Sequence, residues 1–545
     1  MQYQENLPEV VPKKISNNYV LFHDGHFYRK EDHEIVCSPN EQFTEWTSKA
    51  HLIIGFDIVN AIIESEGAVD CNLSVLFRDS RVIDLKILFK LVSLATEGSL
   101  FAPSNIHDLN KTLRLRRLIC PNIEEDDSVS VRLETIKVCY DYLEWKIRKI
   151  DGSNSLTHDI QIRADYALRK VEKIGYAIDR QQVEVLSAHT QSEIQDELKI
   201  LESYGWSPGA GSESRYEEIV ESLKQSHVIN LPITKTGKVS SAERHLSDLS
   251  VTIPFFKSYL EFFSLRKLQS TYLEKMKVDV LHPHYNTLVS TGRTSSFDPN
   301  FQNFPRDEAI RRCFVPRSGY KLLVADYSTI ELCALAQTCL TRFGFSRMGE
   351  LINSGVDLHR WFASIILNKS ENQVSKQERT YAKACNFGFP GGLGVKQFLE
   401  YAKHTYGIDD LDLKTARNFK TQWLEAFPEM NSYLSAEGHA YRTKAVAATV
   451  TGRLRAGCTF TQAKNFPFQG LAADGAKISL FNLITSGFRV LNYVHDEFVI
   501  ELLDDGSLSE RRSEAEQIMI QGMKSACPDM EIRIESEICD YWKKL

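Results

Sequence analysis

Two aspartates stand at the ends of apolar segments, where their type and position suit metal chemistry. Asp326 ends the run YKLLVAD at 320–326, and Asp496 lies 170 residues later between two further apolar runs. Two carboxylates on neighbouring strands can hold two divalent cations about 3.5–4 Å apart, and such a pair stabilises the attacking and leaving oxygens of a phosphoryl transfer. Carboxylate oxygens are ligands that Mg²⁺ prefers. Taken alone, each aspartate is more simply explained as a turn or capping residue.

A second group of candidates lies in one short segment, 378–389 (ERTYAKACNFGF). Arg379, Lys383 and Phe387 follow one another at intervals of four, so all three project from one face of a helix. Two cations followed by an aromatic ring suit a triphosphate beneath a base and a sugar. A solvated basic stripe with one core phenylalanine is the plainer alternative.

The polar segment 291–306, TGRTSSFDPNFQNFPR, is rich in Arg, Ser, Asn and Gln. Such side chains contact phosphate and sugar without requiring a particular base. An ordinary surface loop explains the same composition.

The surrounding patterns predict the elements that position these residues. The run at 320–326 precedes the helical pattern STIELCALAQ, which predicts a strand leading into a helix with Asp326 at the junction. FRVLNYV and FVIELL flank His495-Asp496-Glu497 and predict a hairpin with the acidic residues at its tip. The polar stretch 151–157 (DGSNSLT) precedes a long helical pattern and predicts the first domain boundary.

The composition excludes several classes of protein. The chain has 545 residues, of which 43% are hydrophobic and 25% charged, as in an ordinary globular protein. This excludes a disordered tail, a fibrous repeat and a disulfide-stapled miniprotein. No apolar run approaches the ~18–20 residues that span a bilayer, and the N-terminus lacks the apolar stretch of a signal peptide. The formal net charge of −7 argues weakly against a nucleic-acid-binding protein, whose contact surface is usually basic.

Four segments, in order, resemble the signatures of family A DNA polymerases, the DNA polymerase I type. They are TGRTSSFDPNFQNFPR, DYSTIEL (326–332), RTYAKACNFG (379–388) and VHDEFVIE (494–501), with weaker matches at 265–273, 357–363, 451–455 and 465–474. The resemblance extends from about residue 160 to the last residue, and the short length and the variant NFGFPGGLG are most similar to bacteriophage members. Gly391 stands where the family has a tyrosine, which leaves the stacking of the template base open.

The resemblance implies a fold, which is an α+β multidomain right-hand polymerase with helical thumb and fingers and an antiparallel-sheet palm. A small α/β exonuclease-like domain of the ribonuclease H type is expected to precede it. The implied limits are 1–155 for this first domain, 156–290 for the thumb, 291–345 and 475–545 for the palm, and 346–474 for the fingers.

The resemblance also implies a role for each matching residue. Asp326 and Asp496 correspond to the two metal-binding aspartates, with the Tyr327 backbone carbonyl completing the metal shell and Glu497 supporting them. The residues that correspond to the nucleotide site are Arg379, Lys383, His359, Phe387 and Glu331. Among these, Lys383 is implied as the acid that protonates the leaving group, and Glu331 as the residue that excludes a 2′-hydroxyl. The residues that correspond to primer and template contacts are Arg293, Asn300, Gln302, Asn303, Gln469 and His495.

The implied function is template-directed addition of deoxynucleotides to a primer 3′-hydroxyl, with two Mg²⁺ ions as cofactors or Mn²⁺ in their place. The implied partners are primer-template DNA, deoxynucleoside triphosphates and replication accessory proteins, with no membrane. The expected location is the cytoplasm, that of the bacterial host for a phage-encoded chain. Positive charge is expected locally rather than overall, at Arg266, Lys267, Arg293, Arg306, Arg379 and Lys383.

Two rival functions stay open at this point. A single-subunit RNA polymerase shares the fold but needs an open position where Glu331 stands. A catalytically inactive DNA-binding relative would keep the fold for a structural role.

Residues 51–145 loosely resemble the 3′–5′ proofreading exonuclease that commonly precedes a family A polymerase. Asp57, Asp84 and Asp141 match acidic positions of that domain, but Lys137 occupies the position of its usual tyrosine and no DxE strand stands near its start. An incomplete carboxylate cage binds metals poorly. We therefore expect a vestigial, inactive exonuclease-like domain, with an unrelated α/β domain as the alternative.

Overall fold

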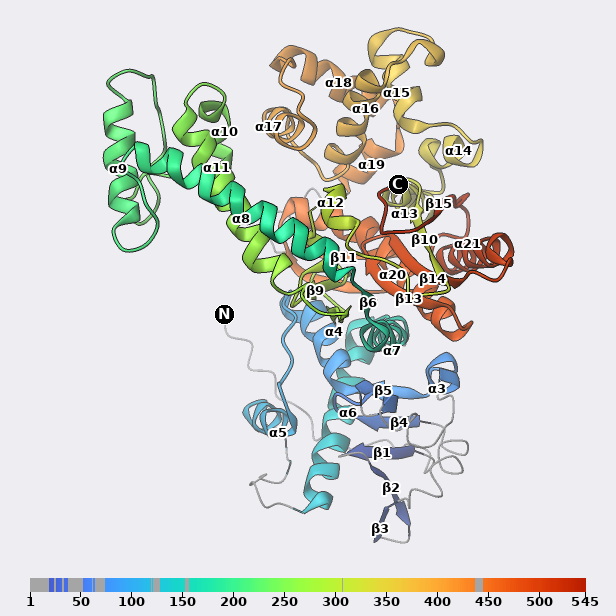
Figure 1. Ribbon diagram of the computed structural model, residues 1–545. Helices are drawn as coiled ribbons and strands as arrows, with labels where there is room; N and C mark the ends of the chain where they lie inside the picture. The colour runs from blue at the N-terminus through green and yellow to red at the C-terminus, as the bar shows by residue number, and fades with distance from the viewer. Residues whose placement is uncertain are drawn as a thin grey trace.

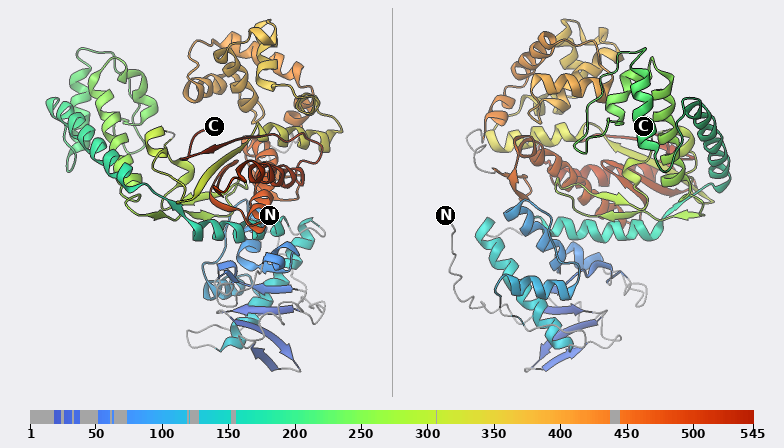
Figure 2. Two further views of the ribbon diagram at one scale, coloured as in Figure 1. Left: turned by 45° about the vertical axis from the view of Figure 1, so that its right-hand side comes forward. Right: turned by 90° about the vertical axis from the view of Figure 1, so that its left-hand side faces the viewer.

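The computed structural model describes residues 19–23, 26–31, 34–37, 52–60, 62–63, 74–118, 120, 128–151, 156–305, 307–436 and 445–545. These residues form a central sheet, two helical regions that rise on opposite sides above it, and an N-terminal α/β unit below it (Figure 1). The same arrangement is visible after rotation about the vertical axis (Figure 2).

The central sheet contains four antiparallel strands in the order β13-β14-β10-β15. Their bounds are Arg489–Val494 for β13, Glu497–Leu503 for β14, Tyr320–Tyr327 for β10 and Ile534–Cys539 for β15. The expected antiparallel palm sheet is therefore confirmed, and so are the hairpin around residue 496 and the strand at 320–326, which extends one residue further to Tyr327.

The middle strand, β10, is buried on both of its faces. Leu323 and Ala325 pack in the main core, whereas Leu322 and Val324 pack in a second core that contains Trp542. Successive residues of a strand point to opposite faces of the sheet. Both faces are therefore covered, which explains why the sequence shows a continuous apolar run instead of an alternating one.

α20 (Phe460–Thr485) packs against α13 (Ile330–Phe343) and α21 (Leu508–Lys524), and α20 and α21 also contact strands of this sheet. α20 continues without a break across the predicted palm limit at 474/475. No helix or strand begins or ends at that limit, so it stays a prediction, as do the other predicted domain limits.

The first helical region contains α8 (Arg180–Ser203), α9 (Ser212–Leu223), α10 (Glu243–Ser250) and α11 (Pro254–Lys267), followed by the π-helical turn η2 (Leu268–Leu273). Trp206 is the largest residue of its core, and its indole contacts the rings of Tyr259 and Phe262. This region has its own apolar core, because these residues form a cluster separate from the main one.

The second helical region contains six helices and one 3₁₀ turn. They are α14 (Arg347–Asn353), α15 (Leu358–Leu367), η4 (Glu371–Gln373), α16 (Lys376–Gly388), α17 (Val395–Tyr406), α18 (Leu413–Ala426) and α19 (Glu429–Ser435). α16 begins with a capping box, in which the Ser375 hydroxyl accepts a hydrogen bond from the Glu378 backbone and the Glu378 carboxylate accepts one from the Ser375 backbone. Such a cap satisfies two of the unpaired N–H groups at a helix start. It therefore fixes the start of the helix whose one face carries Arg379, Lys383 and Phe387.

Short elements connect the sheet with the helical regions. They are β6 (Tyr176–Ala177) paired with β7 (Val280–Leu281), β8 (His284–Asn286) paired with β9 (Ser295–Phe297), η3 (Phe301–Asn303), α12 (Glu308–Arg311), and β11 (Ala445–Ala448) paired with β12 (Leu454–Cys458). β8 and β9 flank the turn that carries Arg293.

The N-terminal unit is a mixed sheet with helices, as expected for an α/β domain. Its strands are β1 (Tyr19–His23), β2 (His26–Glu31), β3 (Glu34–Cys37), β4 (Leu52–Gly55) and β5 (Val82–Asp84), in the order β3-β2-β1-β4-β5. The first three are antiparallel, and β4 runs parallel to both β1 and β5. Its helices are α3 (Ser74–Arg78), α4 (Leu85–Glu97), α5 (Ile106–Leu115) and α6 (Val129–Asp151).

One helix joins this unit to the rest of the chain. α7 (His158–Ile174) packs against α3 and α4 of the N-terminal unit and against α20 and β13 beside the central sheet. In Figure 1 it lies between the two parts, although the sequence placed it at the start of the thumb. Within the described residues, no helix is both long enough and apolar enough to cross a membrane.

Candidate active site

A cavity of about 960 Å³ opens where the central sheet meets the second helical region. Twelve of the residues singled out in the sequence line it: Arg293, Asp326, Tyr327, Glu331, His359, Arg379, Lys383, Phe387, Gly391, Gln469, His495 and Asp496. The structure thus brings the strand-end aspartates and the cationic helix face into one site, although they are far apart in the chain.

The two aspartates meet because of strand register. Asp326 is the penultimate residue of β10 and lies opposite Glu497 of β14, and Asp496 precedes Glu497 in the hairpin turn. His495 allows this turn by adopting a left-handed conformation, with φ of 59°. Glu497 is not in the cavity lining, and its carboxylate accepts a hydrogen bond of 2.7 Å from the Trp542 indole.

The carboxylates of this pair are held in an environment that disfavours their negative charge. Burial raises the pKa of Asp326 well above its ordinary value, and the charges of Asp496 and Glu497 raise it further. Burial also raises the pKa of Asp496, while Arg293 opposes that rise. Oδ1 of Asp326 is buried and has no hydrogen-bond partner among the described residues.

This donor set fits divalent cations. A buried carboxylate oxygen without a partner, beside a second carboxylate, is an arrangement that a bound cation would satisfy. In the described parts of the chain no three His, Cys, Asp or Glu side chains form a metal-binding group. Two carboxylates are nevertheless enough for Mg²⁺, which usually keeps waters and takes its remaining ligands from substrate phosphates.

Glu535 of β15 is an acidic residue of this site that the sequence reasoning missed. It lies opposite Asp326 in the sheet, lines the cavity and contributes to the raised pKa of Asp326. It belongs to no motif, because its segment IESEIC is an ordinary alternating strand. Only the pairing of β15 with β10 reveals it.

The helix face of α16 points into the cavity. Arg379 Nε and Nη2 donate hydrogen bonds of 2.8 and 3.2 Å to the carboxylate of Asp357, which also caps the start of α15. Lys383 is exposed, and no ion pair joins it to another residue in the described ranges. The two cations therefore differ: one is held by a carboxylate, and the other faces the cavity alone.

His359 and Phe387 stand together on the wall of the site, with ring centroids 5.5 Å apart. His359 is only 2% exposed, and its Nδ1 lies 3.0 Å from the Asn386 amide nitrogen. Burial lowers the pKa of His359 to about 3, with Arg379 and Lys383 adding to the effect. The imidazole is therefore neutral at pH 7 and can act as a hydrogen-bonding group without adding charge.

Glu331, in the first turn of α13, forms an ion pair with Arg293 in the cavity. Arg293 follows the turn at 289–292 and also faces Asp496, whose charge raises the pKa of the guanidinium against the lowering effect of burial. One arginine thus links the acidic pair to the carboxylate expected beneath the sugar.

Three of the predicted DNA contacts lie outside the cavity. Asn300 caps the 3₁₀ turn η3, Gln302 donates a hydrogen bond of 2.8 Å to Thr294, and the Asn303 carbonyl accepts one of 2.9 Å from Tyr272. Their backbone is thus fixed close to the loop of Arg293. Arg306, expected to add positive charge here, lies outside the described residues.

The space that a side chain at position 391 would need is filled by Asn465. A Cβ atom there would lie 2.8 Å from Asn465 Oδ1, so Asn465 fills the space next to the glycine. Asn465 lines the cavity together with Tyr401 and Tyr406 of α17. The two tyrosines were missed because aromatic residues at helical spacing are typical of an ordinary core.

A model of DNA polymerase family A matches residues 180–544 of this chain. The chain belongs to DNA polymerase family A. Members of this family generally use divalent metal ions.

Two curated relatives show how the chain compares with complete family A proteins. DNA polymerase I of Aquifex aeolicus is 30% identical over 344 residues, which cover 60% of this chain and 58% of the relative. DNA polymerase I of Lactococcus lactis subsp. cremoris is 27% identical over 520 residues, which cover 83% of this chain and 56% of the relative. The chain thus spans little more than half the length of these relatives.

The fold is also that of a solved family A structure. The POL domain of Pol1 from M. smegmatis, in complex with DNA primer-template and dNTP, superposes with a TM-score of 0.72. It is 23% identical in sequence, and the match covers 90% of this chain and 86% of that domain. The expected right-hand polymerase fold is confirmed.

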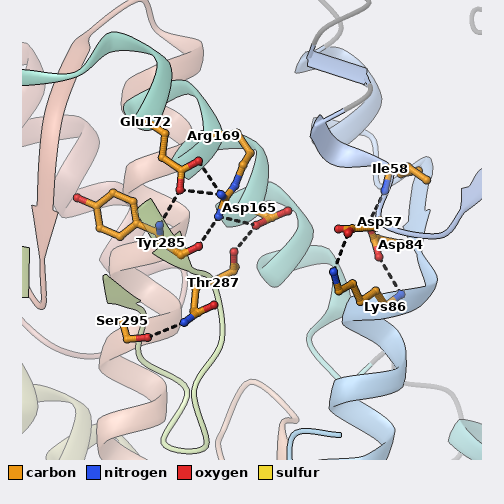
Figure 3. A network of polar contacts seen from close by, with 11 residues as sticks. Asp57, Ile58, Asp84, Lys86, Asp165, Arg169, Glu172, Tyr285, Thr287 and Ser295 are labelled. Atoms are coloured by element: carbon orange, nitrogen blue, oxygen red, sulfur yellow. Dashed lines mark hydrogen bonds and ion pairs between the residues drawn. The ribbon is translucent and has the colours of Figure 1, made fainter. Parts of the chain in front are cut away.

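In this family A member Asp57, Asp84 and Asp141 each have other partners, and the described residues of the N-terminal unit contain no group of three metal-ligating side chains. Asp84 is 1% exposed, accepts hydrogen bonds from the backbone of Ile58, Lys86 and Ile87, and has its pKa raised by burial to about 7. Asp57 forms an ion pair of 2.6 Å with Lys86 instead, a contact that is drawn in Figure 3. Asp141 is paired with Lys137 at 2.5 Å, so lysines occupy the surroundings of two of the three carboxylates.

Proposed function

We propose that this chain is a template-directed DNA polymerase, which adds deoxynucleotides to the 3′-hydroxyl of a primer. The observation that carries the proposal is the shared cavity of Asp326, Asp496 and the Arg379–Lys383 helix face. One wall of the cavity has carboxylates that can hold metal cations, and the opposite wall has positively charged side chains that can bind phosphates. This combination suits a phosphoryl transfer. The names of the relatives and the primer-template and dNTP bound to the M. smegmatis domain support the same activity.

In this proposal Asp326, Asp496 and the Tyr327 backbone carbonyl hold two divalent cations, with Mg²⁺ as the natural choice and Mn²⁺ as the substitute. Bound there, such cations would lower the pKa of the primer hydroxyl and neutralise charge that develops on the phosphate. Tyr327 is suited to a backbone role, because its own hydroxyl is buried in hydrogen bonds with Ser479 and the Met519 carbonyl. Glu497, anchored on Trp542, stiffens the turn next to Asp496.

The opposite wall binds the incoming triphosphate. Arg379 and Lys383 supply charge to the phosphate oxygens, and neutral His359 supplies a hydrogen bond from the α15 side. Lys383 is also the general acid that protonates the departing pyrophosphate. Phe387 packs against the sugar and base, as its position one turn beyond Lys383 allows.

Primer and template lie along the rest of the site. Arg293, Gln469 and His495 contact the primer end and the minor-groove side of the last base pair, since all three line the cavity. Asn300, Gln302 and Asn303 contact the DNA backbone next to it, on the fixed loop that follows Arg293.

Deoxynucleotides are expected to be incorporated by the wild-type chain at least about 100-fold more efficiently than ribonucleotides on a primed DNA template. Glu331 is the group that excludes the 2′-hydroxyl, so Glu331→Ala is expected to reduce this preference at least about tenfold. The preference is measured as the ratio of the catalytic efficiencies for addition of a single dNTP and of a single rNTP.

Two controls separate exclusion of the hydroxyl from other effects. Glu331→Gln removes the ion pair with Arg293 but keeps the bulk of the side chain, so the sugar preference should survive. Glu350→Ala, at an exposed site on α14, should change nothing. A wild-type chain that prefers ribonucleotides would favour the RNA polymerase alternative.

We also propose that the N-terminal unit is a vestigial exonuclease-like domain without activity. Incubated with Mg²⁺ and a primer that has a mismatched 3′ end, the wild-type chain is expected to release no nucleotides. The support is the pairing of Asp57 and Asp141 with lysines and the use of Asp84 as a helix cap. Release of nucleotides by the wild type that is lost in Asp141→Ala would show that the site is active.

A bacteriophage origin, with a role in phage-type replication or repair, is the context that we propose. The NFGFPGGLG variant at 386–394 supports it. The place of action would then be the cytoplasm of the bacterial host, with accessory replication proteins as further partners.

A further inference from the structure

The turn that precedes Arg293 contacts a buried ionic cluster. Lys477 of α20 donates hydrogen bonds of 2.7 Å to the Gly292 carbonyl and 2.6 Å to Gln161 Oε1. Asp474, one turn earlier, accepts from Gln161 at 3.0 Å and forms an ion pair of 2.6 Å with Arg453. Lys477, Asp474, Arg453 and Gln161 are all 0% exposed.

The fit between this cluster and the turn is close. Gly292 has φ of 94°, and a Cβ atom there would lie 2.1 Å from Nη2 of Arg453. The same guanidinium lies against Gly470, which follows the cavity residue Gln469. The backbone that immediately precedes Arg293 is therefore packed directly against the cluster.

Gln161 belongs to α7, and the same face of that helix continues along the segment that leads to the turn. Asp165 accepts a hydrogen bond from the Thr287 hydroxyl, Arg169 donates one of 2.5 Å to the Tyr285 carbonyl, and Glu172 accepts one of 2.6 Å from the Tyr285 backbone. Figure 3 shows these three side chains of α7 pointing toward Tyr285 and Thr287. We call Gln161, Asp165, Arg169 and Glu172 the α7 ladder.

Tyr285 also contacts the β13–β14 hairpin, whose turn contains Asp496. Its hydroxyl donates a hydrogen bond of 2.7 Å to Asn492 and accepts one of 3.2 Å from the backbone of Tyr493, both on β13. β13 leads directly into His495 and Asp496.

The other side of α7 is anchored on the N-terminal unit. Arg163 donates hydrogen bonds to the carbonyls of Phe77 and Arg78 and to the Ser80 hydroxyl, at 2.8–3.0 Å. The ring of Tyr166 packs on Phe77 with centroids 4.5 Å apart. A helix fixed on both sides is a rigid support for the segment that its ladder holds.

We propose that the α7 ladder is a positioning element, which fixes the segment 285–293 so that Arg293 enters the cavity beside Asp496 and Glu331. This inference rests on the proposed polymerase function, in which Arg293 contacts the primer end. α7 precedes the segment 180–544 that matches the family, so the ladder supports residues 285–293 from a helix outside that segment. Small displacements of such a group lower reaction rates by up to about 100-fold.

A double-mutant cycle between the ladder and Arg293 tests the proposal. Gln161→Met and Thr287→Val each remove ladder contacts with little change in volume, and each is expected to lower kcat for single-nucleotide addition about tenfold. The KM for the nucleotide should change less than about twofold, because the triphosphate cations are untouched. Arg293→Ala is expected to lower kcat about 100-fold.

The cycle distinguishes positioning from a purely structural role. If the ladder acts through Arg293, Gln161→Met or Thr287→Val combined with Arg293→Ala should be no slower than Arg293→Ala alone. Effects that multiply, to about 1,000-fold, would overturn the proposal, and so would folded single variants that keep the wild-type rate.

Folding and function are controlled separately. Gln161→Met removes one acceptor from the buried amino group of Lys477, so thermal unfolding is measured for every variant. The isosteric Thr287→Val decides the matter if Gln161→Met does not fold. Gln521→Met, the same replacement at an exposed site on α21, should behave as wild type. If wild type and Gln521→Met both fail to extend a primer, the proposed function is wrong and this inference falls with it.

Discussion

Replacement of Asp326 or Asp496 by asparagine is expected to abolish primer extension, with a loss of more than about 10³-fold, while duplex binding survives. Each asparagine keeps the shape of the side chain but removes a charged oxygen ligand. The cost should be large because these carboxylates are half-buried and Oδ1 of Asp326 has no protein partner to replace a cation. Single-turnover extension gives the rate, and fluorescence anisotropy with labelled primer-template gives binding.

A matched control is available at the far end of β14, the strand that follows Asp496. Asp504 is exposed beyond the end of β14, so Asp504→Asn removes a similar charge without touching the cavity. It should extend primers at the wild-type rate. Full extension by Asp326→Asn or Asp496→Asn would contradict the assignment of the acidic pair, whatever the control does.

Lys383→Met is expected to lower kcat by about 10²–10⁴-fold, the range typical for loss of a general acid. Lys383 stands exposed at the cavity wall without an ion pair in the described part of the chain, so its charge is available to a substrate. Arg379 shares its charge with Asp357 and should matter more for nucleotide binding than for the chemical step. Pre-steady-state rates at saturating nucleotide separate these two contributions.

Lys376→Met is the control for this prediction. It lies on the same helix, is exposed and is outside the cavity lining, so it should leave kcat unchanged. A Lys383→Met variant that retains the wild-type kcat and loses only nucleotide affinity would show that Lys383 is a phosphate contact without an acid role.

Strand ends and helix spacing were the parts of the site that sequence could locate. Asp326 follows an apolar run, residue 496 sits between two such runs, and Arg379, Lys383 and Phe387 recur at one-turn intervals, so local pattern sufficed to place them. The structure brings them into one cavity, while the roles assigned to them stay predictions.

Contacts between distant residues were beyond that reasoning. The ion pair of Arg379 with Asp357, the place of Glu535 beside Asp326, and the bridge from Gln161 to Lys477 depend on which elements pack together. Glu535, Gln161 and Lys477 stand in no pattern that distinguishes them from a surface charge or a polar helix residue. α7 is the clearest case, because its ladder reads in sequence as an ordinary polar helix face.

The net charge of −7 also has a local explanation. Part of the acidic surplus lies in the site itself, at Asp326, Asp496, Glu331 and Glu535, where bound cations would offset it. Arg293, Arg379 and Lys383 line the same cavity. Because local fields act on a bound polyanion more strongly than the total charge does, the overall sign says little about DNA binding.

Template-directed addition of single nucleotides by the wild-type chain tests the polymerase assignment most directly. Four primed DNA templates that differ only at the templating base are each incubated in Mg²⁺ with one deoxynucleoside triphosphate at a time. We expect each template to direct the addition of its complementary nucleotide. Failure to add any nucleotide, or addition of the same nucleotide on all four templates, would contradict the assignment.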